Sequence, residues 1–267
     1  MIRNGNTKLV LFEGSKAGKL FSFTTGGDLL MGRNIIRRWG HCAVLMRALL
    51  YNITVNVFRH EKYNRIAESE RLYLVNIYRT QHYIHHLNQE LNVPVVSLMN
   101  GTVMGSGAMF GLNSTWSVAT ERSVWALPEV TIAGMPDVGA LYHMARLEDH
   151  LGTILALSGY RLSASGLVHA GLASHFCRSD TLPGMKKDLL FNGEDNKAVK
   201  QILDEYHQDS ENDTKVKDSI AQLRFKSKQA YNSKDIREII HNLKVMNDDW
   251  SKNQLSLLSK ACPLSLR

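Results

Sequence analysis

The sequence predicts an α/β fold, and three observations support this prediction. Residues 95–99 are almost continuously apolar, as in a strand that is buried on both faces of a sheet. Asn100-Gly101 then marks a turn, and the small residues of the following run predict a second turn that leads into a helix. Helical periodicity appears on both sides of this stretch, so strands and helices share one chain.

The composition sets limits on the class of protein. The chain has 267 residues, of which 44% are hydrophobic, which suits one large or two small globular domains. Its three cysteines (Cys42, Cys177 and Cys262) are far apart, so we expect neither a disulfide framework nor a zinc site, and a reducing compartment. No apolar run reaches the length of a membrane-spanning helix. A strand-like run begins at Lys8, so a signal or transit peptide is absent, removed, or outside this numbering.

The charge of the chain points to its possible partners. The formal net charge is +7, which favours nucleic acid, an anionic membrane or a phosphorylated cofactor. Residues 33–71 hold eight Lys or Arg and three acidic residues, with aromatic residues between them. This pattern suits either a nucleic-acid surface or, more commonly, a solvated helical face.

The first ninety residues predict strands followed by helices. Residues 7–23 have the pattern of a strand, a turn and a short extended segment. Two glycines in residues 24–28 predict a tight turn whose amides are free to bind a ligand. Residues 29–92 are expected to be largely helical.

Three histidines share one face of the last predicted helix in this region. His82, His85 and His86 are spaced by three and four residues, which is compatible with metal binding. No HExxH motif and no third-ligand motif accompany them. We therefore interpret them as surface histidines and predict no metal site.

Apolar periodicity predicts three short helices after residue 137, over residues 138–150, 151–157 and 164–171. Pro136-Asp137 lies where the N-cap of the first of these helices is expected. Gly159 ends the second helix, and a short strand at residues 172–173 follows the third.

Residues 178–267 are polar and are expected to be mostly helical. Four helices are predicted, over residues 197–206, 214–223, 234–247 and 250–260. We therefore expect a core of residues 1–177, with a basic helical insertion at about 30–80, and a helical C-terminal region of residues 178–267.

The glycine-rich turn is a candidate binding site. Gly105, Ser106 and Gly107 have little side chain, so a ligand can approach the backbone closely. With Gly111 they form GxGxxxG rather than GxGxxG, and no GK[ST] follows, so nucleotide binding is disfavoured. A turn that leads into a helix instead favours an oxyanion site, with a second donor from the turn at 24–27.

Glu129 and Asp137 are the candidate acidic groups of this centre. Two backbone amides and a nearby carboxylate are what acyl or enolate chemistry requires, because the amides hold the oxyanion and the carboxylate moves a proton or activates a nucleophile. Each residue also has a plainer explanation. Glu129 suits a solvated loop, Asp137 suits a helix cap, and Ser106 is simply small.

Four segments of the sequence resemble the crotonase (enoyl-CoA hydratase/isomerase) superfamily: residues 24–29, 94–139, 157–176 and 248–267. The most specific is PEVTIAGMPDVG, since the 3-hydroxyisobutyryl-CoA hydrolase subgroup carries a Glu and an Asp at this separation. The similarity runs from about Thr7 to Arg267 and is weakest in residues 30–80. It implies a crotonase-like spiral of ββα turns that binds a CoA thioester in a bent conformation, with no separate cofactor.

The resemblance implies a role for each residue at a matching position. The amides of Thr25 and Ser106 are expected to hold the oxyanion. Glu129 is expected to act as base or nucleophile on the thioester carbonyl, and Asp137 to contact the substrate hydroxyl or assist proton transfer. The expected substrate-binding residues are Gly26, Gly27, Gly105, Gly107 and Gln81.

The sequence also departs from the family pattern. Hydratases carry a first catalytic Glu where this chain has Met109, which disfavours hydration and leaves hydrolysis. Ser106 replaces the middle glycine of the turn, and Gln81 stands where an acidic residue is usual. The segment between Asp28 and Pro94 is longer than usual. The opening strands and the last helices of the family are missing from the sequence.

Two functions are compatible with these features. The first is hydrolysis of a short 3-hydroxyacyl-CoA thioester by Glu129, in the mitochondrial matrix and in valine catabolism. The alternative is a weakened or silent copy that serves as a structural protein of the mitochondrial ribosome small subunit, as relatives of this hydrolase do in some lineages. Ribosomal proteins and rRNA would then contact residues 33–71.

Missing strands and helices leave an open sheet edge and apolar surface, so a companion chain, a homo-oligomer or a larger assembly is expected to cover them.

Overall fold

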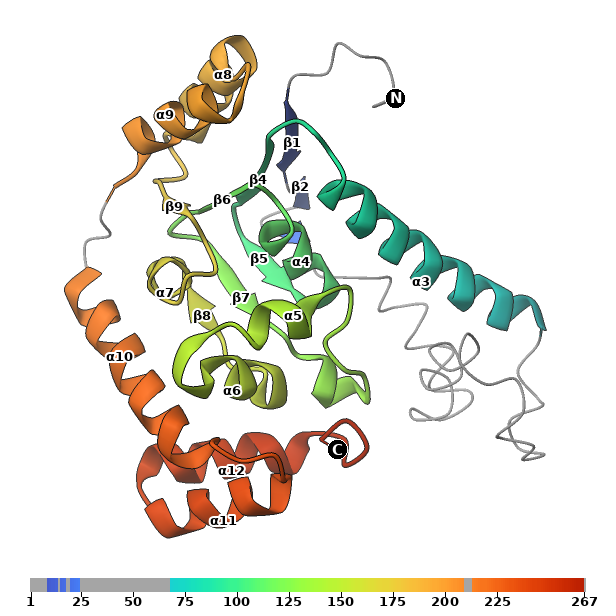
Figure 1. Cartoon of the computed structure of the whole chain (residues 1–267), viewed down its shortest axis with the longest axis vertical. Helices are drawn as coiled ribbons and strands as arrows, with labels where there is room; N and C mark the ends of the chain where they lie inside the picture. Colours follow the sequence, from blue (N-terminus) through green and yellow to red (C-terminus); the bar gives the residue numbers. More distant parts are fainter. Residues whose placement is uncertain (1–8, 14, 18–19, 25–67, 209–212, 267) are drawn as a thin grey trace.

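A computed structural model of the chain describes residues 9–13, 15–17, 20–24, 68–208 and 213–266 (Figure 1). Its strands form two sheets. The first contains, in spatial order, β1 (Val10–Glu13), β4 (Val95–Met99), β6 (Trp116–Ala119) and β9 (His175–Phe176), and every neighbouring pair is parallel. The second contains β2 (Ser15–Ala17), β3 (Leu20–Thr24), β5 (Thr102–Met104), β7 (Val124–Ala126) and β8 (Leu162–Ser163).

The chain passes from the first sheet to the second and then through a helix, and it repeats this path. Strand β4 leads through a turn at Gly101, where φ is +120°, into β5, and β6 leads into β7 in the same way. Strands β3, β5 and β7 are parallel neighbours, whereas β2 and β8 pair antiparallel at the two edges. This spiral of ββα turns confirms the predicted α/β fold. Strands β1 and β3 correspond to the predicted strand and extended segment of residues 7–23, whereas β2 lies where a turn was expected.

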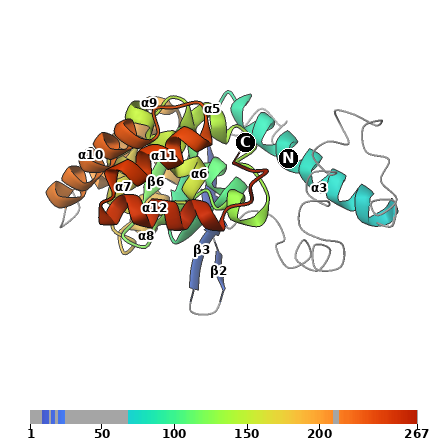
Figure 2. The ribbon, with the colours of Figure 1, turned by 90° about the horizontal axis from the view of Figure 1, so that it is seen from below.

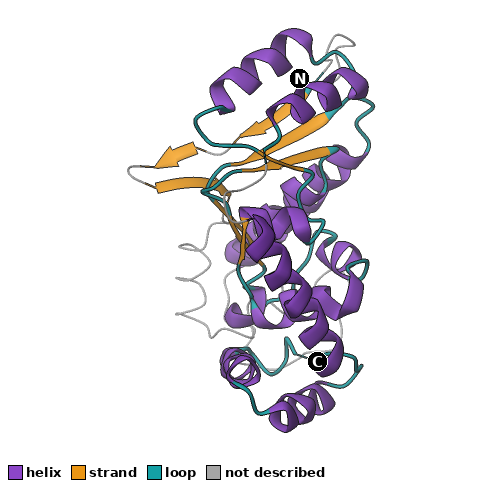
Figure 3. Cartoon of the chain, turned by 90° about the vertical axis from the view of Figure 1, so that its left-hand side faces the viewer, coloured by secondary structure: helices purple, strands orange, loops and turns teal. Residues whose placement is uncertain are grey.

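Helices surround the sheets (Figures 1 and 3). The α-helices are α3 (Glu68–Gln89), α4 (Ala108–Leu112), α5 (Ala140–Met144), α6 (Leu151–Ser158), α7 (Ala164–His169), α8 (Leu182–Asn192), α9 (Asn196–Tyr206), α10 (Asp213–Ala230), α11 (Ile236–Met246) and α12 (Asp249–Lys260). Three 3₁₀ turns join them: η2 (Gly105–Gly107), η3 (Glu129–Ile132) and η4 (Glu148–His150). No helix in these described ranges is long and apolar enough to cross a membrane.

Strand β4 explains why residues 95–99 are apolar throughout. Successive side chains of a strand point to opposite faces, so both faces must be covered. Val96 and Leu98 pack with α8 and α9, whereas Met99 belongs to a second core that also contains Trp125 and the inner faces of α6 and α7. Helices α10 to α12 join this second core, and Figure 2 shows α11 and α12 side by side. The predicted division at residue 177 stays a prediction.

Most predicted helices are present, with three corrections. The helix predicted over 138–150 is wrong as a single element, because the left-handed residues Asp149 (φ 54°) and His150 (φ 60°) separate α5 from α6. Asp137 does not cap α5, whose N-cap is Gly139 with no side-chain hydrogen bond. The strand expected at 172–173 lies at 175–176 instead.

Two further differences concern a helix that was not predicted and a predicted helical region that is only partly described. Helix α8 was not among the four helices predicted for residues 178–267. It contains Pro183 in its first turn, where a proline is tolerated. Of the helical region predicted over 29–92, only residues 68–89 are described as helix. Residues 29–67, and with them most of the basic segment 33–71, lie outside the described residues.

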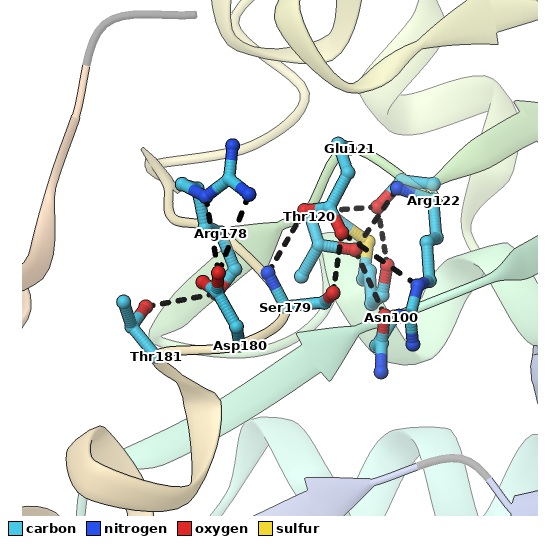
Figure 4. A network of polar contacts seen from close by, with 10 residues as sticks. Asn100, Thr120, Glu121, Arg122, Arg178, Ser179, Asp180 and Thr181 are labelled. Atoms are coloured by element: carbon cyan, nitrogen blue, oxygen red, sulfur yellow. Dashed lines mark hydrogen bonds and ion pairs between the residues drawn. The ribbon is translucent and has the colours of Figure 1, made fainter.

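A polar network fixes the loops that follow the parallel strands of the first sheet (Figure 4). The Thr120 hydroxyl donates to Asn100 Oδ1 at 3.0 Å, which joins the loops after β6 and β4. The Ser179 amide donates to Glu121 Oε2 at 2.8 Å, which adds the loop after β9. These bonds hold the carboxyl ends of the three strands in register, and none of them involves a candidate site residue.

Candidate active site

The glycine-rich turn lies between β5 and α4, as predicted. Gly105 has a φ of +62°, a left-handed conformation that favours glycine, and it begins η2 directly after Met104. Ser106 is half-buried and is not among the non-glycine residues of the described chain with a positive φ. The serine therefore fits this turn without backbone strain, although it replaces a glycine of the family pattern.

Glu129 begins η3, and Leu127 and Pro128 separate it from the end of β7. Its backbone segment is held by two hydrogen bonds, from the Gly134 amide to the Glu129 carbonyl and from the Cys262 amide to the Val130 carbonyl, both 2.9 Å long. Neither carboxylate oxygen of Glu129 is accessible to solvent, and neither has a hydrogen-bond partner among the described residues. The interpretation of Glu129 as a solvated loop acid is therefore wrong.

The burial of Glu129 changes its acidity. Burial raises the pKa of Glu129 to about 7; the amide of Glu129 itself opposes this shift, and the charge of Asp137 adds to it. The carboxyl group is thus poised to exchange a proton near neutral pH, which is where a general base is most effective.

Asp137 lies in the loop between η3 and α5. Its side chain is 16% exposed, and Nε2 of His82 lies 3.8 Å from Oδ2 of Asp137. Burial raises the pKa of Asp137, whereas His82 and the amide of Asp137 itself lower it. The next residue, Val138, has a φ of 44°, which is rare for a β-branched side chain and marks a constrained backbone.

Helix α3 brings two of its histidines to this region. His82 is about half exposed and faces Asp137, whereas the His85 residue is only 4% exposed. The interpretation of all three histidines as surface residues is therefore wrong for His85, because α3 packs this face against α4, where the His85 and Phe110 rings are 4.4 Å apart. No group of three or more potential metal ligands occurs in the described part of the chain.

The structure brings together some of the predicted site residues. Glu129 and Asp137 are close enough for the charge of one to affect the other. The Ser106 carbonyl raises the pKa of His85, so the glycine-rich turn and α3 also affect each other. Gln81, a half-buried residue of α3, precedes His82. Three predicted residues, Thr25, Gly26 and Gly27, lie outside the described residues, so the second oxyanion donor stays a prediction.

Sequence reasoning missed two features of this site. The spacing of His82 and His85 placed them on one helical face, but nothing in the sequence showed that this face meets the Asp137 loop. Asn113, at the end of α4, had no sequence pattern that marked it. Its buried side chain contacts His85, Val138 and His143, and so joins three parts of the site region.

A cavity of about 520 Å³ is lined in part by Gly111 and Leu112 of α4, and none of the predicted site residues lines it. Its lining includes His143, Arg146, Glu148, Ser174 and Arg224. The His143 ring, which donates to Asn113, forms part of its wall.

We expect the substitution His82→Gln to raise the pKa of Asp137, because His82 is a group that lowers it. The carboxyl carbon of Asp137, followed by NMR over a pH titration, reports this change directly. His86→Gln is the matched control, since His86 is on the same helix but pairs with Glu90 at 3.3 Å. An equal Asp137 pKa in both variants would contradict the contact.

Comparison with known proteins indicates the family of the chain. A family model described as enoyl-CoA hydratase/isomerase matches residues 54–267. The mitochondrial 3-hydroxyisobutyryl-CoA hydrolase of Homo sapiens is 30% identical over 191 residues, which cover 71% of this chain and 50% of the hydrolase. The probable 3-hydroxyisobutyryl-CoA hydrolase 3 of Arabidopsis thaliana is 34% identical over 197 residues, which cover 72% and 51%. The chain thus spans about half the length of these relatives.

The fold also matches solved structures. The carnitinyl-CoA dehydratase of Mycobacterium thermoresistibile has a TM-score of 0.75 and 22% sequence identity, over 99% of this chain and 65% of that enzyme. At this identity the match concerns the fold alone.

Proposed function

Because the chain belongs to the enoyl-CoA hydratase/isomerase family, we propose that it hydrolyses a short 3-hydroxyacyl-CoA thioester, with 3-hydroxyisobutyryl-CoA as the first candidate. The observation that carries this proposal is the Glu129 carboxyl group, buried without a hydrogen-bond partner and close to Asp137. The two relatives described above are named as hydrolases of this thioester. By the same resemblance we propose a role in valine catabolism and a mitochondrial location.

The proposed reaction uses the site as follows. The Ser106 amide, with a second amide expected from Thr25, stabilises the negative charge that develops on the thioester oxygen. In one route, ionised Glu129 removes a proton from the attacking water, the carbon–sulfur bond breaks, and protonated Glu129 returns this proton to the CoA thiolate. In the other route, Glu129 attacks the carbonyl carbon and the carbon–sulfur bond breaks to leave an anhydride, which water then hydrolyses to the free acid and Glu129, while a proton of that water neutralises the thiolate. Asp137 contacts the substrate hydroxyl or assists this proton transfer.

Hydration of an enoyl-CoA is not part of the proposal. The position of the first catalytic Glu of hydratases is occupied by Met109, which is fully buried in the core and cannot transfer a proton. The chain therefore has one carboxyl group fewer for this chemistry than a hydratase.

The pH dependence of the rate follows from the raised pKa of Glu129. The base must be ionised, and its pKa of about 7 lies well above the usual range of a glutamate. We expect log kcat/KM to increase with pH up to about 7 and then to level off. A rate that is already maximal at pH 5 would show that Glu129 is not the group that must be ionised.

The proposal is tested by the release of CoA from the purified protein, detected with a thiol reagent. 3-Hydroxyisobutyryl-CoA is the main substrate, and crotonyl-CoA, monitored for hydration, tests the competing reaction. Turnover of the first and not of the second supports the proposal. CoA release no faster than that of Glu129→Gln would overturn it.

The structural role in a mitochondrial ribosome finds no support in these relatives, which are CoA enzymes by name. That alternative rested on the basic segment 33–71 and on the missing ends, and most of this segment lies outside the described residues. We therefore do not propose it.

A further inference from the structure

The Asn113 side chain is the centre of a buried polar network beside the site. The residue is 9% exposed and lies directly after α4. Its amide nitrogen is 3.2 Å from Nδ1 of His85 and 3.3 Å from the Val138 carbonyl oxygen. Its amide oxygen is 2.8 Å from Nε2 of His143. One side chain therefore connects α3, the loop that carries Asp137, and α5.

The orientation of this amide is fixed by its partners. A carbonyl oxygen can only accept a hydrogen bond, so the group that faces Val138 must be the NH₂ of Asn113. The same NH₂ then donates its second hydrogen to His85, and Nδ1 of His85 must be the acceptor. The amide oxygen in turn accepts a hydrogen bond from His143.

The orientation of Asn113 therefore sets the tautomer of His85. Burial lowers the pKa of His85 to about 4, with His82 adding to this effect and the Ser106 carbonyl opposing it, so the ring is neutral at pH 7. A neutral ring with an acceptor at Nδ1 carries its hydrogen on Nε2. This nitrogen is buried and has no hydrogen-bond partner in the described chain. The ring packs on Phe110 of α4, with 4.4 Å between the ring centroids.

The second hydrogen bond that the Asn113 side chain donates holds the backbone of the loop that carries Asp137. Val138 has the left-handed φ of 44° and Gly139 a φ of +92°, so the backbone after Asp137 needs outside contacts to keep its shape. The Asn113 amide provides one of these contacts at the Val138 carbonyl.

We propose that Asn113 is a positioning residue. It holds the Asp137 carboxyl group through Val138, and it holds the Ser106 turn through His85, whose ring packs on Phe110 in the helix that follows this turn. The proposal rests on the proposed function, since these are the groups expected to bind the oxyanion and the substrate hydroxyl. Asn113 does not itself contact the substrate.

The decisive substitution is Asn113→Asp, which keeps the shape of the side chain but removes both donated hydrogens. Asn88→Asp is the matched control: Asn88 is 5% exposed, and its amide donates to the Asn113 main-chain carbonyl at 2.8 Å rather than to His85 or Val138. We expect Asn113→Asp to lower kcat about 100-fold, as expected for misplaced reacting groups, while KM changes less than about threefold. Asn88→Asp should leave kcat within about twofold of the original protein.

A second measurement does not depend on activity. In ¹⁵N-histidine spectra at pH 7.5, His85 of the original protein should carry its hydrogen on Nε2, and Asn113→Asp should move it to Nδ1. The NMR pKa of Asp137 should change in the same variant and not in Asn88→Asp. If Asn113→Asp does not fold, Asn113→Ser against Asn88→Ser gives the same comparison without a new charge.

The two proposals fail in different ways. Equal losses of kcat in the Asn113 and Asn88 variants, or a His85 hydrogen on Nδ1 in the original protein, would overturn the positioning role. If the original protein releases no CoA, the hydrolase proposal fails. The positioning role is then decided by the NMR results alone, and it is overturned if His85 and Asp137 respond equally in both variants.

Discussion

Replacing Glu129 by glutamine is expected to lower kcat for CoA release about 1,000-fold, because glutamine cannot accept a proton or attack the thioester carbonyl. The side chain keeps its size, so KM should change little. Steady-state kinetics with 3-hydroxyisobutyryl-CoA measures both constants. Glu205→Gln is the matched control, since Glu205 is exposed on α9 and accepts a hydrogen bond from the Gln201 side chain. A Glu129 variant as active as this control would contradict the proposed role.

The same substitution should make the protein more stable at high pH. The pKa of Glu129 is raised to about 7, so between pH 4.5 and 7 the folded state holds a proton that the unfolded state has lost. The free energy of unfolding therefore falls as the pH rises through this range. At pH 8, Glu129→Gln should be more stable by up to about 3 kcal/mol, whereas at pH 4 the two proteins should be equal. Urea unfolding at both pH values measures the difference in the free energy of unfolding. If Glu129→Gln is no more stable than the original protein at pH 8, burial of the ionised Glu129 side chain does not destabilise the fold.

Gly152→Ala is expected to destabilise the fold by about 3 kcal/mol or more. Gly152 lies in α6, and a Cβ atom there would be 1.9 Å from the Met144 carbonyl oxygen at the end of α5. The three nearest atoms all belong to the Met144 backbone, so none of them can rotate away as a side chain would. The two helices would have to separate, and urea unfolding at pH 7 should show a much lower midpoint or no folded protein.

Gly166→Ala provides the control for this experiment. Gly166 is also a helical glycine, but a Cβ atom there would be 3.4 Å from its nearest neighbour, Oγ of Ser163, an ordinary contact. Alanine is the better helix former, so the stability should stay within about 1 kcal/mol of the original protein. Equal effects of the two substitutions would contradict the close approach of α5 and α6.

Local patterns predicted those elements that local interactions determine. Helices α9, α11 and α12 begin with Asp195, Asp235 and Asp248, whose side chains accept hydrogen bonds from the amides of the first turn. Gly159, with a φ of +63°, ends α6 as expected. The predictions failed where the backbone takes a left-handed conformation at residues whose type does not indicate it. Asp149 and His150 are both left-handed and interrupt a periodic segment.

The candidate site was predicted in part. The resemblance identified Glu129 and Asp137, whose roles stay predictions, and local sequence correctly placed the turn at Ser106 before a helix. The sequence contained no information about which residues surround these groups. His85 is buried because α3 packs on α4, and Asn113 acts through contacts with three separate segments. Such contacts depend on tertiary packing, which periodicity and spacing do not describe.

The hydrogen bond from the Cys262 amide to the Val130 carbonyl affects the order in which the site can be completed. Val130 follows Glu129 in the middle of the chain, whereas Cys262 follows the last helix. During synthesis the two sheets can pair, and α6 can pack on them, before Cys262 has left the ribosomal exit tunnel. The segment that carries Glu129 gains this contact only afterwards, so a nascent chain can have its core before its proposed catalytic group is fixed in place.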